Sequence, residues 1–256
     1  QKSGSFKIRG SINNILSLNE DQINRGITAV SAGNHAIAAS YAANLFNIKN
    51  KIFLYEKANA FRVQSCKKFN ANIIFTKADN SFANVQLAQK EGYTFIHPSD
   101  GVNTLQGTAT LGLELANQVK FLNKKIDNII ISVGGGGLIS GVGSFLKQIY
   151  PDIKIIGVEP IGAKGMTESL NNDKPLNNIK IKSIADSLCA PLHMPYSFSV
   201  AKNVIDLMIN ITDEEMIEGM IYAYENFKLM LEPACLAGFA ALRNHLNGKI
   251  KNQNTV

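Results

Sequence analysis

Short apolar runs alternate with helix-like patterns along most of the sequence, and this alternation limits the possible fold more than any other feature. The run 128–133 (Asn-Ile-Ile-Ile-Ser-Val) is almost wholly apolar, as expected for a strand covered on both sides. It leads through a glycine-rich turn into the apolar, helix-length segment 138–149. Strands that alternate with helices form parallel sheets with helices on both faces. We therefore predict the α/β class, with mostly parallel twisted sheets flanked by helices.

The same alternation predicts the individual elements. Strands are expected at 27–30, 51–55, 72–76, 94–96, 128–133 and 154–158. Helices are expected at 7–18, 34–46, 61–69, 81–91, 138–149 and 213–227. The last helix has Thr212 as its N-cap, and Glu215 at the following N3 position completes a capping box. Turn-forming residues accumulate over 162–195, where we expect an irregular segment.

The segment 134–137 consists of consecutive glycines between a predicted strand and a predicted helix. Glycines let the backbone approach a ligand closely, and the free amides at a helix N-terminus favour an anion such as phosphate. A tight strand-to-helix turn is the alternative, although a turn needs fewer glycines. Walker A and GxGxxG patterns both fail, because Val142 stands at the Walker lysine and Ile139 or Ser140 at the last dinucleotide glycine. The loop therefore predicts a phosphorylated cofactor or a phosphosugar.

The segment 31–35 (Ser-Ala-Gly-Asn-His) has the same position after a predicted strand. It offers a hydroxyl, an amide and helix N-terminal N–H groups, which suit a substrate carboxylate or a phenolic oxygen. Ser31 or Asn34 could instead be a simple N-cap, and His35 a packed histidine. This loop is a second candidate anion site.

Lys7 is the third candidate functional group, as a lysine that could form a Schiff base. A lysine amine reacts with an aldehyde in this way only when its pKa leaves part of it neutral. Small residues precede it in the run Ser3-Gly4-Ser5-Phe6, and Phe6 could help to exclude water. An exposed lysine at the start of an amphipathic helix would give the same pattern. A phosphorylated aldehyde with a phenolic oxygen would use all three candidates, and pyridoxal 5′-phosphate is such a molecule.

Charge and composition exclude several other classes. The net charge is +6, but the basic residues are scattered and tryptophan is absent from the sequence, so we predict no nucleic-acid partner. The segments 27–48 and 129–146 lack charged residues but contain Gly, Ser or Asn, so we expect no membrane span. The 3 cysteines are widely spaced and no charged-then-apolar leader opens the chain, which indicates a reducing, cytoplasmic location.

Taken together, these segments resemble the threonine/serine dehydratases and serine racemases, which are fold-type II pyridoxal-phosphate enzymes. The resemblance covers essentially the whole chain, and its motifs follow the family's order. The matching segments are 3–10, 31–35, 106–108 with Glu114, 134–138, 157–160, 184–186 and 231–234. The resemblance implies a small substrate domain at 28–105 and a large cofactor domain formed by 1–27 plus 106–256, with the cofactor between them. A homo-oligomer, dimer or tetramer, is implied by analogy alone.

The resemblance also implies a role for each matching residue. Lys7 would hold the cofactor in a Schiff base and then remove the α-proton of the substrate, with Phe6 beside it. Asn34 would bond the phenolic oxygen, and Glu232 would lie near the ring, unless it merely caps the turn before Pro233. The phosphate would be bound by the backbone of Gly134, Gly135, Gly136, Gly137 and Leu138. The carboxylate of an amino-acid substrate would be bound by Ser31, Ala32, Gly33, Asn34 and His35.

Departures from the family pattern change what we expect. Ala32 stands where serine racemases have a serine that acts as acid/base on the face opposite the lysine. Racemisation needs a proton-transfer group on each face whereas β-elimination needs one, so Ala32 favours a dehydratase. Ile37 replaces the usual glutamine, which could shift the substrate preference. Glu159 and Ala163 match ligands of the family's divalent cation, but Gly165 replaces the aspartate, so we predict no strong metal site.

The expected function is therefore β-elimination from L-threonine or L-serine, giving 2-oxobutanoate or pyruvate and ammonia. Alternatives stay open: dehydration of another β-hydroxy amino acid such as 3-hydroxyaspartate or phenylserine, serine racemisation, a non-catalytic amino-acid-binding module, and, more distantly, phosphosugar binding. The chain opens inside a functional loop and stops at 254–256 where a strand begins. We therefore expect a piece of a longer protein, with the loop that faces the pyridine nitrogen beyond Val256.

Overall fold

The structure is a computed structural model that describes residues 2–31 and 33–256. It divides into two compact units, Gln1–Thr108 and Ala109–Val256. Helix α6 (Val102–Phe121) contains the boundary between them. The grouping of 28–105 against 1–27 plus 106–256 concerns functional domains rather than compactness, and it stays a prediction.

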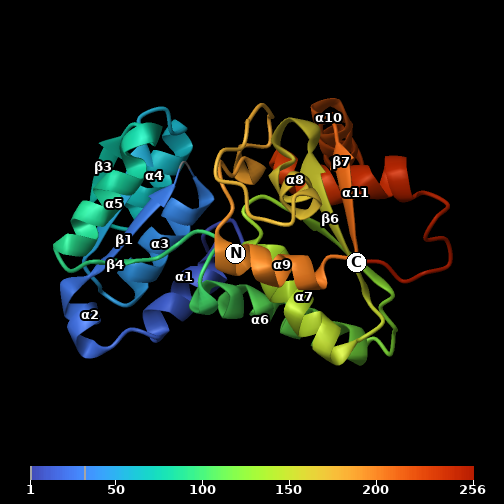
Figure 1. The fold of residues 1–256 in the computed structure, drawn as a ribbon, viewed down its shortest axis with the longest axis horizontal. Helices are drawn as coiled ribbons and strands as arrows, with labels where there is room; N and C mark the ends of the chain where they lie inside the picture. The colour runs from blue at the N-terminus through green and yellow to red at the C-terminus, as the bar shows by residue number, and fades with distance from the viewer. Residues whose placement is uncertain (1, 32) are drawn as a thin grey trace. The chain divides into compact units, whose positions relative to one another are not determined.

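The first unit is built on a parallel sheet with the strand order β3-β2-β1-β4, drawn in blue to cyan in Figure 1. Neighbouring strands pair in parallel, and the β1–β2 register runs from Ile27 beside Asn50 to Ser31 beside Leu54. The strands are β1 (Ile27–Ser31), β2 (Asn50–Tyr55), β3 (Ile73–Thr76) and β4 (Thr94–Phe95). The helices are α1 (Lys7–Leu16), α2 (Glu20–Arg25), α3 (Asn34–Leu45), α4 (Ala60–Lys68) and α5 (Ser81–Lys90), with the 3₁₀ turn η1 (Ala78–Asn80).

The central strands β1 and β2 are buried on both faces of this sheet, which explains their continuous apolar runs. Successive residues of a strand point to opposite faces. Ala29, Ile52 and Leu54 belong to a core shared with α1, α3 and α4. Val30 and Phe53 belong to a separate core, which they share with α5. The loops that leave this sheet therefore start from a rigid base.

The second unit has a parallel sheet in the order β5-β6-β7 (Figure 1). The strands are β5 (Asn128–Ser132), β6 (Lys154–Pro160) and β7 (Leu207–Ile211). The helices are α7 (Gly137–Ile149), α8 (Gly165–Asn171), α9 (Pro195–Val204), α10 (Asp213–Tyr222) and α11 (Pro233–Ala241). The short 3₁₀ and π turns are η2 (Ile161–Ala163), η3 (Asp186–Leu188), η4 (Ala223–Phe227) and η5 (Leu242–Leu246).

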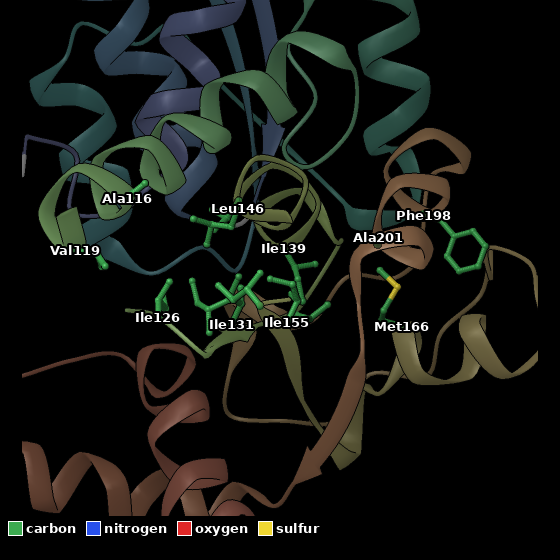
Figure 2. Packing of buried hydrophobic residues seen from close by; sticks show 14 residues of the cluster. Ala116, Val119, Ile126, Ile131, Ile139, Leu146, Ile155, Met166, Phe198 and Ala201 are labelled. Carbon is green, nitrogen blue, oxygen red and sulfur yellow. The ribbon is translucent and has the colours of Figure 1, made fainter. Parts of the chain in front are cut away.

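The second sheet is also covered on both faces. Figure 2 shows one core, in which Ile131 and Ile155 pack with Ile139 and Leu146 of α7. The adjacent residues of the same strands, such as Ile130 beside Ile131, belong to the opposite core, which includes residues of α10 and α11. The α/β class with parallel sheets flanked by helices is confirmed.

The strands and helices predicted from the alternation are present, and most of their boundaries agree within one or two residues. The helix expected at 213–227 instead ends at Tyr222 and continues as the π turn η4. The irregular segment expected at 162–195 contains helix α8, so that prediction was partly wrong. At 254–256, where we expected a strand to begin, the structure has a single isolated parallel bridge between Thr255 and Asn128. The predicted set missed α2, α6, β7, α9 and α11.

In the part of the chain that the structure describes, no helix combines the length and apolar character needed to span a membrane.

The capping box of α10 is confirmed, and it provides a test of local stability. Glu215 N donates a 3.2 Å bond to Thr212 Oγ1, and Thr212 N donates a 2.7 Å bond to Glu215 Oε2. We predict that Thr212→Ala lowers the free energy of unfolding by about 1 kcal/mol, because the Glu215 amide loses its partner. Urea unfolding followed by circular dichroism measures this change. Thr212→Ser is the control and should keep most of the stability; an alanine variant as stable as the parent would contradict the role.

Candidate active site

Lys7 is the first residue of α1 and is half-buried. Its Nζ donates a 2.6 Å hydrogen bond to the carbonyl oxygen of Pro98 and lies 5.0 Å from the centroid of the Phe6 ring. Burial lowers the pKa of Lys7 from 10.5 to about 8, because the charged form loses its hydration. Near neutral pH an appreciable fraction of this amine is therefore neutral, which is the form that attacks an aldehyde.

Two histidines share the surroundings of this amine. His35 is 3% exposed, and its Nε2 lies 2.8 Å from the carbonyl oxygen of Ile96, so this nitrogen carries the hydrogen. His97 accepts a 3.1 Å bond at Nδ1 from the backbone amide of Ser99, so its hydrogen is on Nε2. Burial, with the charge of Lys7 as a further cause, lowers the pKa of His35 to about 3 and that of His97 to about 4. Both rings are therefore neutral at physiological pH.

The loop after β1 turns directly into α3. Ser31 ends the strand, and its Oγ accepts a 3.0 Å bond from the amide of Gly33. Asn34 is the first residue of α3. Ala32, which was predicted to contact the substrate carboxylate, lies outside the described residues. Carboxylate binding by Ser31, Gly33, Asn34 and His35 stays a prediction, and the Nε2 of His35 is already engaged by Ile96.

Arg62 of α4 is a candidate that the sequence did not reveal. A Cβ placed on Gly33 would lie 2.6 Å from Cζ of Arg62, so the guanidinium lies against the loop after β1. A guanidinium can bind a carboxylate through parallel N–H···O bonds. Arg62 belongs to no motif, and only the packing of α4 beside α3 brings it to this loop.

In the second unit, the glycine loop joins β5 to α7. Gly136 is the N-cap of α7 with φ 86°, in the left-handed region that glycine adopts at little cost. A Cβ on Gly136 would lie 2.8 Å from Cε of Met166, and a Cβ on Gly134 would lie 3.0 Å from the backbone of Leu188. Glycine is therefore needed here both for conformation and for space. Gly137 opens α7, whose N-terminal amides suit an anion, while phosphate binding stays a prediction.

Leu138 and Glu232 were also predicted to lie at the cofactor site, and the structure shows what their side chains contact. Leu138 packs against the core of Figure 2, so its contribution to a ligand site would come from its backbone. Glu232 is the N-cap residue of α11, and its Oε1 accepts a 3.0 Å bond from Ser187 Oγ. The predicted position of Glu232 near a cofactor ring stays a prediction.

Glu159, the first expected cation ligand, is buried and hydrogen-bonded to other residues of the protein. Its carboxylate is 1% exposed and accepts bonds from the amides of Met166 (2.6 Å) and Thr167 (2.8 Å) and from Thr167 Oγ1 (2.8 Å). Burial raises the pKa of Glu159 to about 7, against the opposing effect of these bonds. Among residues 2–31 and 33–256, no group of three or more His, Cys, Asp or Glu side chains could hold a metal ion.

Known proteins resemble this chain over nearly its whole length. A protein family described as "Pyridoxal-phosphate dependent enzyme" matches residues 1–256. The chain is 37% identical to a phenylserine dehydratase of Ralstonia pickettii, covering 98% of this chain and 76% of that protein. It is 32% identical to an L-threonine ammonia-lyase of Thermotoga maritima, covering 98% of this chain and 62% of that protein. The structure of maize serine racemase matches with a TM-score of 0.91 and 32% identity, covering 99% of this chain and 77% of that one.

The low pKa of Lys7 predicts a pH-dependent stability cost in the protein without ligands. The folded pKa of about 8 lies below the ordinary 10.5, so between these values the unfolded chain binds more protons and stability rises with pH. At pH 7 the full cost is present, and we predict that Lys7→Met stabilises the protein by about 1–2 kcal/mol, allowing for the lost bond to Pro98. The gain should fade as the pH rises from 8 to 10. Urea unfolding of both proteins at several pH values measures this; a variant destabilised at pH 7 would refute it.

Proposed function

Because the chain belongs to the pyridoxal-phosphate dependent enzyme family, we propose that it converts L-threonine or L-serine to 2-oxobutanoate or pyruvate, with release of ammonia. The family's cofactor is pyridoxal 5′-phosphate, which when bound withdraws electrons from the bond between Cα and its hydrogen. The other steps of the proposal are carried by side chains and backbone groups of this chain. A homo-oligomeric assembly and a cytoplasmic location, which rest on resemblance and composition, belong to the same proposal.

The described residues fit this cofactor. Lys7 offers an amine whose pKa of about 8 suits attack on an aldehyde. Ser5, two positions before it, has a buried Oγ that finds no hydrogen-bond partner within the described part of the chain, as expected where a polar ligand is to bind. In the second unit, the glycine loop leads into the N-terminus of α7, whose backbone amides suit a phosphate. Lys7 would thus hold the aldehyde end and residues 134–138 the phosphate.

Lys7 Nζ is also the proposed base. In its neutral form this nitrogen can accept the proton from the substrate Cα, and neither His35 nor His97 places a positive charge beside it, because both rings are neutral. The bond from Nζ to Pro98 O gives the free amine a defined resting position. This hydrogen bond of a buried amine is the single observation that carries the proposal.

The loop after β1 is the proposed carboxylate site. Ser31 retains a hydroxyl hydrogen to donate, since its Oγ accepts from Gly33 N, and Asn34 opens α3 with its N-terminal amides. Arg62 would add a guanidinium to the same loop, since it lies against Gly33. Binding the carboxylate would orient the Cα hydrogen with respect to the base.

Elimination is favoured over racemisation by the residue at position 32. Ala32 carries no proton that could be delivered to the face opposite Lys7, and elimination needs only one side-chain base. Serine racemisation is therefore the weaker alternative. Dehydration of phenylserine is the second candidate, because the relative from Ralstonia pickettii, at 37% identity, is a phenylserine dehydratase. Rates with threonine, serine, phenylserine and 3-hydroxyaspartate separate these dehydratase activities.

The test of the proposed reaction is formation of 2-oxo acid by the cofactor-loaded protein. We predict that Lys7→Ala lowers kcat/KM by about 10³-fold or more, because both the covalent anchor and the base are lost. Coupled assay of 2-oxobutanoate and pyruvate measures this. Lys124→Ala, at an exposed position of the second unit, should leave the rate unchanged. Full activity in Lys7→Ala would refute the assignment of the lysine.

The role of Arg62 predicts an effect on substrate binding. We expect Arg62→Ala to raise KM for the amino acid about tenfold, since a charge-assisted carboxylate contact is lost, while kcat changes less. Arg62→Lys should recover part of the affinity. Lys67→Ala, an exposed residue of the same helix, is the matched control. An unchanged KM in Arg62→Ala would show that the guanidinium does not contact the substrate.

A further inference from the structure

His193 connects the glycine loop to helix α8 through hydrogen bonds at both of its ring nitrogens. The residue lies in the segment between α8 and α9 and is 4% exposed. Its Nε2 lies 3.1 Å from the carbonyl oxygen of Gly134, the first residue of the glycine loop. Its Nδ1 lies 2.9 Å from Oγ of Ser169, a residue of α8 that is 0% exposed. Ser169 Oγ also accepts a 3.2 Å bond from the amide of Leu176.

These contacts determine where each hydrogen is. A carbonyl oxygen can only accept, so Nε2 of His193 carries the hydrogen and donates it to Gly134 O. In the neutral ring Nδ1 is then an acceptor, and the hydroxyl of Ser169 donates to it. Burial lowers the pKa of His193, which favours this neutral form. The donor–acceptor order therefore runs in one direction, from the Leu176 amide through Ser169 and His193 to Gly134.

The direction of the Gly134 carbonyl matters because it belongs to a planar peptide group. In a trans peptide the C=O of one residue and the N–H of the next point in opposite directions. A bond that holds Gly134 O toward His193 therefore turns the N–H of Gly135 away from His193. The backbone dihedral angles of consecutive glycines change at little energetic cost. Without such a bond, the amides of this loop would therefore sample several orientations.

Helix α8 also supports the loop through Met166. The Cε of Met166 is the atom that a Cβ on Gly136 would meet at 2.8 Å, so the methionine packs against the loop. Figure 2 shows the Met166 side chain in the same core as Ile139 and Phe198. The amide of Met166 donates to the buried Glu159 carboxylate, which fixes the first turn of α8 to the end of β6.

Gly165, which replaces the aspartate expected of a cation site, makes room for this arrangement. A Cβ on Gly165 would lie 2.4 Å from Cδ1 of Ile179 and 3.2 Å from Cε1 of His193. Any side chain at this position would displace Ile179 or the histidine ring. The space that a third ligand side chain would need is thus filled by Ile179 and His193.

We propose that His193 is a positioning residue for the cofactor phosphate: by bonding to Gly134 O, it orients the amides of the glycine loop toward the phosphate before the cofactor binds. This inference rests on the proposed function, since it takes the loop as the phosphate site. Pre-orientation increases affinity because the loop does not have to be ordered on binding. The effect is specific to the phosphate end of the cofactor.

The test compares the dissociation constants of pyridoxal 5′-phosphate and of pyridoxal, which lacks the phosphate, in the intact protein. We expect His193→Phe to weaken binding of the phosphorylated ligand about tenfold or more, and to leave pyridoxal affinity within about twofold, because only the loop amides are misoriented. His193→Gln can still donate to Gly134 O and should recover most of the affinity. His245→Phe is the matched control: it removes another histidine bond of the second unit, to Glu215, away from the loop. Titration followed by absorbance gives each constant.

Ser169→Ala provides an independent variant in case His193→Phe does not fold. It removes the donor to Nδ1 but keeps the histidine, so phosphate-specific affinity should fall by a smaller factor, about threefold. The inference is overturned if these variants weaken both ligands equally or neither. If the parent protein binds the two ligands equally, the phosphate assignment of the loop fails, and the inference fails with it. If the parent prefers the phosphorylated ligand and His193→Phe keeps that preference, only the inference fails.

Discussion

The chemistry proposed for this molecule depends on one physical constraint, the burial of the Lys7 amine. Burial lowers the pKa of the amine to about 8, and the Pro98 carbonyl compensates part of the lost hydration. The same burial keeps His35 and His97 neutral. Packing of α1 against α3 maintains this environment at the cost of some stability. The first unit therefore keeps part of this amine neutral, as its proposed roles as nucleophile and base require.

Each candidate anion loop begins where a strand of a parallel sheet ends, as is usual for ligand sites in α/β folds. β1 ends at Ser31 and leads into the loop before α3, and β5 leads into the glycine loop. Residues of β1 and β5 pack into cores on both faces of their sheets, so these strand ends have fixed positions within their units. In the second unit the end of β6 adds Glu159, which holds the start of α8 and, through it, the support of the glycine loop.

The sequence predicted the elements whose patterns are local. The continuous apolar runs marked strands buried on both faces, and the glycine run marked a backbone that needs space and a positive φ, as Gly136 does. The sequence could not reveal contacts that only tertiary packing creates. Arg62 reaches Gly33 through the packing of α4, His97 meets Lys7 through the loop after β4, and His193 meets Gly134 across 59 positions. None of these residues has a neighbouring motif that would mark it.

Reductive trapping of the cofactor shows which lysine binds its aldehyde. Borohydride reduction of the loaded protein, followed by peptide mapping with mass spectrometry, locates the lysine that binds the aldehyde. We predict a phosphopyridoxyl group on Lys7, because its amine has a lowered pKa and is held by the Pro98 carbonyl. A label on another lysine, or no label, would contradict the account.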